Sequence, residues 1–115
     1  MLIARAGGER GKEVSRLRIT LSGRHVTITE AIREYAREKV EKLGKYFEGI
    51  TNSQVKLSVE GVQHNAEIIV AAAGGATIIA SASSNDMYSA IDIVSEKVER
   101  QLKKHKAKLQ SRRTR

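Results

Sequence analysis

The sequence predicts a two-layer α+β domain in which two amphipathic helices cover one face of a four-stranded sheet. Hydrophobic residues alternate in four short stretches and recur at helical spacing in two longer ones. These stretches follow in the order strand, helix, strand, strand, strand, helix. The length of 115 residues fits one domain, and 40% hydrophobic residues suffice for a core. One Phe, three Tyr and no Trp mean that this core is aliphatic.

The chain divides into a polar start, one folded domain and a short basic end. Residues 1–15 hold glycines and mixed charges without a hydrophobic period, and we expect a flexible N-terminal extension. Residues 16–110 are predicted to form the α+β domain. It opens with a half-buried strand, because hydrophobic and polar residues alternate over 17–22. Residues 111–115 are predicted to be a frayed basic tail.

The first helix is predicted between a capping box and a glycine. Thr27 and Glu30 have the spacing at which a hydroxyl and a carboxylate cap the first turn, and Gly44 is the expected stop. Tyr46 and Phe47 come next and are expected to pin the helix end to the core. The residues expected on its buried side recur at helical spacing and are Ala31, Ile32, Tyr35, Ala36, Val40 and Leu43.

Three strands are predicted in the middle of the chain. Residues 55–59 alternate as a second strand, and residues 61–65 form a turn or loop. Residues 66–73 and 76–83 are the third and fourth strands, joined by the glycine pair 74–75, which suits a tight hairpin needing positive φ. Three consecutive strands of this kind predict an antiparallel meander.

The last helix is predicted to be the longest element. Residues 84–86 offer an N-cap, of which Asp86 is the simplest candidate. The hydrophobic residues that recur at helical spacing after it are Met87, Ala90, Ile91, Val94, Val98, Leu102 and Leu109.

The net charge of +8 is concentrated at the end of this helix. From Lys97 onward there are nine bases and one acid, Glu99, whereas residues 1–96 hold twelve bases and twelve acids. A neutral body with a strongly basic end predicts a polyanionic partner.

No set of residues predicts catalysis or a cofactor. There is no Cys, and His25, His64 and His105 lie in a turn, a loop and a helix without metal-ligand spacing. Carboxylates fall on helix surfaces among bases, and the glycines of residues 7–11 lack a following Lys-Ser pair. We therefore expect no enzyme, no bound metal and no cofactor. A chain without Cys also suits the cytoplasm.

The basic helix end is the best candidate for binding. Arg100, Lys103, Lys104 and Lys108 share one broad helical face, with Lys106 beside it, and this row suits a phosphate backbone. The alternative is a solubilising helix end, aided by the preference of the helix dipole for cations at a C-terminus. A membrane surface ranks third, since bulky residues are missing. With no helix-turn-helix and few aromatics, shape and phosphate recognition of structured RNA is favoured.

Five motifs carry a family resemblance. They are GRHVTITEAIREY at residues 23–35, KLGKYF at 42–47, HNAE at 64–67, DMYSAID at 86–92 and ERQLKKHK at 99–106. They resemble the ribosome hibernation-promoting factor and ribosome-associated inhibitor family over about residues 17–109.

The resemblance implies a fold similar to double-stranded RNA-binding domains and a non-enzymatic translation inhibitor. It implies binding to ribosomal RNA in the small-subunit channel of messenger RNA and the A- and P-site transfer RNAs, and ribosome hibernation in stationary phase or stress. No membrane and no small-molecule substrate are involved. Longer family members carry a second, dimerising domain, so this chain is either a short form or the N-terminal domain of a long form. It is expected to be a monomer off the ribosome unless a longer form exists. A general double-stranded RNA-binding module is the alternative.

Residues are carried over from the family motifs one by one. The RNA contacts implied are Arg24, Lys42, Lys45, Arg100, Lys103, Lys104 and Lys106. The second choices are His25, Arg33, Arg37, Lys39, Tyr88 and Lys97. Structural roles compete for several of these: Tyr88 as a packing residue, Arg33 and Arg37 in surface ion pairs, and Lys39 beside the buried stripe.

Overall fold

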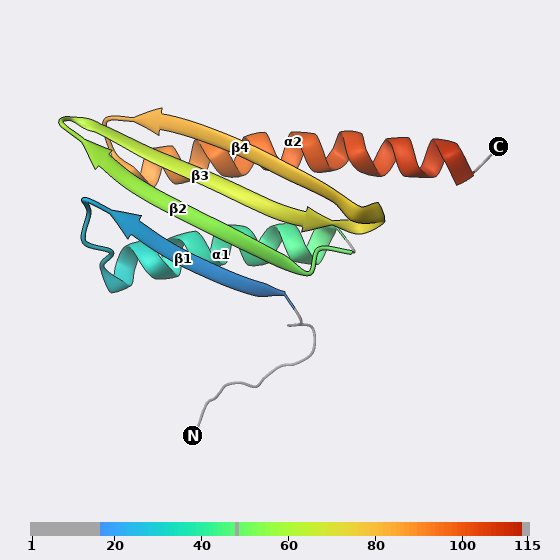
Figure 1. Cartoon of the computed structure of the whole chain (residues 1–115), viewed down its shortest axis with the longest axis horizontal. Helices are drawn as coiled ribbons and strands as arrows, with labels where there is room; N and C mark the ends of the chain where they lie inside the picture. The colour runs from blue at the N-terminus through green and yellow to red at the C-terminus, as the bar shows by residue number, and fades with distance from the viewer. Residues whose placement is uncertain (1–16, 48, 114–115) are drawn as a thin grey trace, which may run out of the picture.

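The computed structural model describes residues 17–47 and 49–113 and contains four strands and two long helices (Figure 1). The elements are β1 (Arg18–Arg24), α1 (Glu30–Tyr46), β2 (Asn52–Glu60), β3 (Gln63–Ala72), the short 3₁₀ turn η2 (Ala73–Gly75), β4 (Ala76–Ser84) and α2 (Met87–Arg113). The predicted order of strands and helices is confirmed. The predicted extension, residues 1–15, lies outside the described residues.

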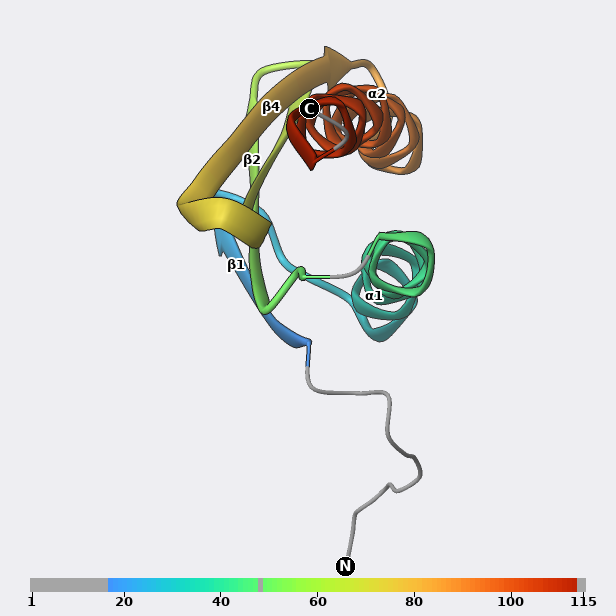
Figure 2. The same cartoon turned by 90° about the vertical axis from the view of Figure 1, so that its right-hand side faces the viewer.

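The four strands form one sheet in the order β1-β2-β3-β4. Strand β1 pairs parallel to β2, which requires the crossover through α1, and the remaining neighbours pair antiparallel as the predicted meander. Both helices lie on the same face of the sheet, side by side, with their N-termini at the same end of the molecule (Figures 1 and 2). The predicted two-layer α+β fold is confirmed.

The core lies between this sheet face and the helices and is aliphatic, as composition predicts. Its fully buried side chains alternate on the central strands and recur at helical spacing on the helices. The largest are Leu57, Ile68, Ile91, Val40, Val55, Val70, Val94 and Val98. All the predicted core residues of α2 from Met87 to Leu102 are buried, while the side chain of Leu109 lies outside the described part.

The ends of α1 differ from the prediction. The N-cap is Thr29, whose Oγ1 accepts a hydrogen bond from the backbone N–H of Ile32 at 3.2 Å, so the predicted cap at Thr27 is wrong. The predicted stop at Gly44 is also wrong, because the helix continues to Tyr46. A Cβ at Gly44 would lie 2.8 Å from Leu17 Cδ2, so this glycine lets the chain before β1 approach the helix closely.

Two residues have different surroundings from those expected, Ala31 at the start of α1 and Tyr46 at its end. Ala31, expected on the buried side, is exposed in the first turn of α1. Phe47 is buried at 8% exposure, but Tyr46 is 68% exposed and does not pin the helix to the core. Only one of the two aromatic residues therefore closes the hydrophobic core.

The β2–β3 connection is shorter than predicted. Glu60 pairs with Gln63, so the turn contains only Gly61 and Val62, and the expected loop over 61–65 is wrong. The polar residues read as loop are satisfied by cross-strand bonds: Asn65 Nδ2 donates to Ser58 Oγ at 3.4 Å and Asn65 Oδ1 accepts from Ser83 Oγ at 2.7 Å. His64, predicted in a loop, is therefore part of β3.

The predicted cap of the last helix is confirmed, and the predicted hairpin turn at the glycine pair is one residue longer than expected, because Ala73 joins the two glycines in η2. Gly74 and Gly75 have φ of 80° and 78°, which glycine adopts without steric cost. Asp86 Oδ2 accepts from the backbone N–H of Ser89 at 3.0 Å at the start of α2. That helix continues to Arg113 and so includes residues 111–113 of the predicted tail.

Candidate nucleic-acid interface

The two helices are joined near their N-termini by a polar contact around Asp92. Asp92 Oδ1 accepts a hydrogen bond from Tyr35 Oη at 2.6 Å, and Lys39 Nζ lies 3.1 Å from the same oxygen. The rings of Tyr35 and Tyr88 meet edge to face at 5.0 Å, and Lys39 Nζ lies 5.3 Å from the centre of the Tyr35 ring. Each side chain that contributes is thereby held by at least one neighbour.

These bonds shift the pKa of each partner. The hydrogen bond from Tyr35 holds the pKa of Asp92 below its ordinary value, with Lys39 acting in the same direction. The hydrogen bond to Asp92 raises the pKa of Tyr35 and also that of Lys39. The contact is therefore most favourable with Asp92 and Lys39 charged and Tyr35 neutral.

Basic residues gather where the same helix pair continues toward its C-termini. Lys42 and Lys45 line a hollow of about 330 Å³ on α1 together with Tyr35 and Lys39, which face α2, and with the carboxylates Glu38 and Glu41. On α2, Lys103 and Lys106 stand eleven and fourteen residues after Asp92, a spacing that returns to the same side of a helix. Lys106 Nζ lies 5.9 Å from the centre of the Phe47 ring, directly after α1.

We call Lys42, Lys45, Lys103 and Lys106 the inter-helix basic face. Both helices contribute to it, although these residues are more than fifty positions apart in sequence. Lys103 is in part compensated by Glu99, whose Oε2 lies 3.5 Å from its Nζ. Four of the seven predicted RNA contacts are thus brought together.

The other flank of α2 faces the edge strand β4. Lys97 Nζ donates to the Ser81 carbonyl at 2.8 Å, and Gln101 Nε2 donates to the Ile79 carbonyl at 3.2 Å. These bonds satisfy backbone groups on the edge of the sheet. Lys97, a second choice for RNA, therefore has a structural role. Lys104 follows Gln101 by three residues and lies on this flank, with exposed Arg100 between the two flanks.

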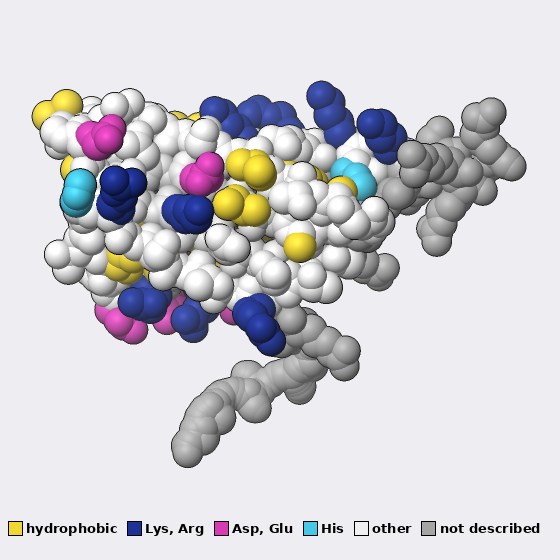
Figure 3. Space-filling view, in the orientation of Figure 1, with side chains coloured by type: hydrophobic (Ala, Val, Ile, Leu, Met, Phe, Trp, Pro, Cys, Tyr) yellow, Lys and Arg dark blue, Asp and Glu magenta, His cyan; other side chains and the backbone are white. Residues whose placement is uncertain are grey.

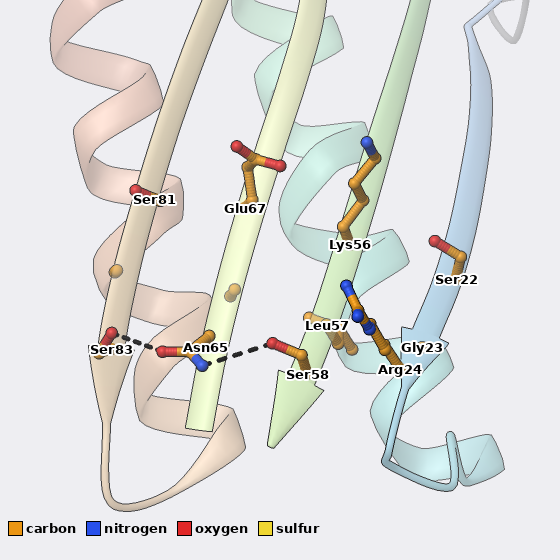
Figure 4. A pocket seen from close by; sticks show the side chains of 12 residues that line it. Ser22, Gly23, Arg24, Lys56, Leu57, Ser58, Asn65, Glu67, Ser81 and Ser83 are labelled. Carbon is orange, nitrogen blue, oxygen red and sulfur yellow. Dashed lines mark hydrogen bonds between the residues drawn. The ribbon is translucent and has the colours of Figure 1, made fainter. Parts of the chain in front are cut away.

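Arg24 lies on the opposite layer of the molecule. By strand parity it shares the open sheet face with Lys56 and Glu67, where a hollow of about 590 Å³ is lined by them and by serines (Figure 4). Figure 3 shows this face, on which charged side chains are few and scattered. The structure does not bring Arg24 together with the bases of the helices.

The remaining predicted residues are also apart from the inter-helix basic face. Arg33 and Arg37 line a hollow of about 40 Å³ with Ile19 and Leu21, on the β1 side of α1. His25 is exposed after β1 with φ of 60°, a left-handed conformation that is uncommon outside glycine.

Two residues of interest were missed. Lys56 lies between the inward-facing Val55 and Leu57, so the alternation itself placed it on the open sheet face. Tyr46 is predicted to pack on the core, and no pattern in the sequence indicates its exposure.

The described residues contain neither a metal-binding cluster nor a membrane-spanning helix. No group of three or more His, Cys, Asp or Glu side chains among them could hold a metal ion. No helix within the described ranges is long and apolar enough to span a membrane.

The chain is similar in sequence to a known family. The profile of the family described as Sigma 54 modulation protein / S30EA ribosomal protein matches residues 19–110. A ribosome hibernation promoting factor of Pseudomonas putida is 42% identical over 95 residues, covering 83% of this chain and 92% of that protein. A ribosome hibernation promoting factor of Escherichia coli is 44% identical over 93 residues, covering 81% of this chain and 97% of that protein.

Two solved structures are also similar. A ribosomal subunit interface protein from Coxiella burnetii superposes with a TM-score of 0.70 at 30% identity, covering 78% of this chain and 98% of that one. The N-terminal domain of Thermus thermophilus Protein Y superposes with a TM-score of 0.69 at 34% identity, covering 75% of this chain and 94% of that domain.

Proposed function

The chain belongs to the Sigma 54 modulation protein / S30EA ribosomal protein family, and we propose that it binds the small ribosomal subunit and keeps the ribosome idle. Relatives named for ribosome hibernation and for the ribosomal subunit interface support this proposal. The protein acts by binding alone, in the cytoplasm, and takes part in no chemical step.

The single observation that carries the proposal is the convergence of lysines from both helices. Lys106 packs over Phe47, so the basic end of α2 lies against the end of α1 that holds Lys42 and Lys45. Lysines from two rigid elements can contact phosphates on two sides of a folded RNA, whereas one helix contacts a single row. We infer that the inter-helix basic face binds ribosomal RNA.

The finer proposal is that the protein occupies the channel of messenger RNA and the A- and P-site transfer RNAs. An occupant of this channel competes with its normal ligands. Small subunits already loaded with messenger RNA and transfer RNA should therefore bind the protein more weakly than empty subunits do. Equal binding to loaded and empty subunits would place the protein elsewhere on the ribosome.

The face itself is tested by two variants of equal charge change. The first variant, Lys103→Glu with Lys106→Glu, reverses the charge on the flank of α2 that faces α1. The second, Lys104→Glu with Lys108→Glu, reverses the charge on the flank that faces β4. We expect the first variant to lose co-sedimentation with small subunits at moderate salt and the second to retain more of it. Co-sedimentation of the first variant at the wild-type level would show that the inter-helix basic face is not the binding surface.

A general double-stranded RNA-binding module is the second candidate, favoured by the α+β fold with two helices on one face. Such a module reads A-form shape and binds a plain duplex as well as a ribosome. Competition decides between the two: a plain duplex in large excess should leave subunit binding intact if the ribosome is the specific partner.

A further inference from the structure

Tyr46 is an exposed aromatic residue at the end of α1. Tyr46 is 68% exposed, whereas the next residue, Phe47, is buried and its ring lies under Lys106. Among the described residues Tyr46 is the most exposed aromatic, and none of them forms a ring contact or side-chain hydrogen bond with it. Folding therefore leaves this residue largely exposed to a partner.

The position of Tyr46 connects it with the inter-helix basic face. Tyr46 follows Lys42 by four residues and Tyr35 by eleven, so the three side chains lie on one side of α1. Tyr35 faces α2 through its bond to Asp92. A free aromatic ring thus stands among lysines that belong to two helices.

We propose that Tyr46 stacks on an unpaired base of the RNA that the inter-helix basic face binds. This inference rests on the proposed function, and it adds that the inter-helix basic face recognises an unpaired base as well as phosphates. A base within a duplex has both faces covered by its neighbours, whereas an unpaired base can receive an aromatic ring. Lysines beside the ring favour a partner that carries phosphate next to an apolar face, and a nucleotide has both.

Stacking and phosphate contact differ in their dependence on salt. Stacking adds affinity that salt hardly changes, whereas each phosphate contact contributes about 0.7–0.9 to the log–log salt slope. The Tyr46→Ala variant should therefore bind small subunits about tenfold more weakly at every salt concentration, with an unchanged slope. Tyr46→Phe keeps the ring and should bind like the wild type. Lys42→Ala should weaken binding and also lower the slope.

Val62→Ala is the matched control. Val62 is 83% exposed at the β2–β3 turn, so it is another exposed apolar side chain, and its removal should leave affinity unchanged. Binding of Tyr46→Ala within about twofold of the wild type, with Lys42→Ala weakened, would overturn the stacking and leave the proposed function intact. Equal weakening of Tyr46→Phe and Tyr46→Ala would overturn it too, since the hydroxyl and not the ring would be the contact.

A fluorescence measurement tests the stacking directly. The chain has no Trp, so Tyr46→Trp introduces a single indole whose emission a stacked base quenches. We expect quenching on addition of small subunits, and none for Val62→Trp. A blue shift without quenching would mean that the ring enters an apolar protein surface, which overturns the proposal. If the wild type itself fails to bind subunits, the proposed function fails and the stacking fails with it.

Discussion

Replacing Asp92 by asparagine should destabilise the protein by about 1–2 kcal/mol. The 2.6 Å bond from Tyr35 reaches a charged acceptor, for which a contribution of about 1.5–3 kcal/mol is typical. The Lys39–Asp92 ion pair adds about 0–1 kcal/mol, because the two side chains are 34% and 41% exposed and solvent screens them. Asparagine retains an oxygen that can accept from Tyr35, so only part of this sum is lost.

The pH dependence of this difference follows from the shifted pKa values. The pKa of Asp92 is lowered, so its contribution is present above the ordinary value of 3.8 and is lost as the pH falls through the lower folded value. The pKa values of Tyr35 and Lys39 are raised, so their contributions are present below 10.0 and 10.5 and are lost as the pH rises through the folded values. The free energy of unfolding of the wild type should therefore exceed that of the Asp92→Asn variant by a constant amount between about pH 5 and about pH 9.

Urea denaturation of both proteins at a series of pH values measures the difference. The free energy of unfolding of the two should converge at acid pH, where Asp92 is protonated. Glu41→Gln is the matched control, since Glu41 is an exposed carboxylate on α1, and it should change stability by less than about 0.5 kcal/mol. A difference that stays constant into strong acid, or a control as destabilised as the variant, would refute the assigned role of the Asp92 charge.

Three further substitutions test other parts of the structure. Lys97→Met removes the bond to the Ser81 carbonyl, so it should lower stability by about 1 kcal/mol in thermal unfolding. Gly44→Ala should change stability by less than about 1 kcal/mol, since the gain in helix propensity offsets the displacement of the flexible end of Leu17, whereas Gly44→Leu should cost more. Arg24→Ala should leave subunit affinity within about twofold if only the helix layer contacts RNA, and a larger loss in the pelleting assay would extend the interface to the open sheet face.

Hydrophobic periodicity predicted the elements because each strand and helix buries one side. It failed at the start of α1, where two threonines compete for the cap. Val26 and Ile28 are half-buried, and a Cβ at Gly23 would lie 2.9 Å from Ile28 Cδ1, so this segment packs against the end of β1. The helix can begin only after this segment, at Glu30 with Thr29 as its N-cap. Tertiary packing therefore decides which threonine caps the helix, and a local spacing rule takes no account of that packing.

The candidate site was predictable in part for a similar reason. Spacing placed the bases of α2 around its exposed surface but could not say which flank faces α1 and which faces β4, since that depends on the neighbouring elements. Lys97 and Lys106 therefore looked alike in sequence and differ in the structure, one bonded to the sheet edge and one packed over Phe47. The separation of Arg24 was predictable: in β1 the hydrophobic residues are odd-numbered, so an even-numbered residue faces outward.

The Asp92 contact also has a consequence for binding, because it holds a lysine that would otherwise be available to phosphate. Lys39 lies on the same side of α1 as Lys42 but is paired with Asp92. The Asp92→Asn substitution frees the ammonium group of Lys39 and raises the net charge by one. The variant should therefore be less stable than the wild type, yet bind small subunits more tightly at low salt. Its salt slope should be steeper by up to about 0.9, the value of one added phosphate contact. Weaker binding with an unchanged slope would show instead that the contact sets the spacing between Lys42 and Lys103, and that this spacing matters more to RNA than the added charge.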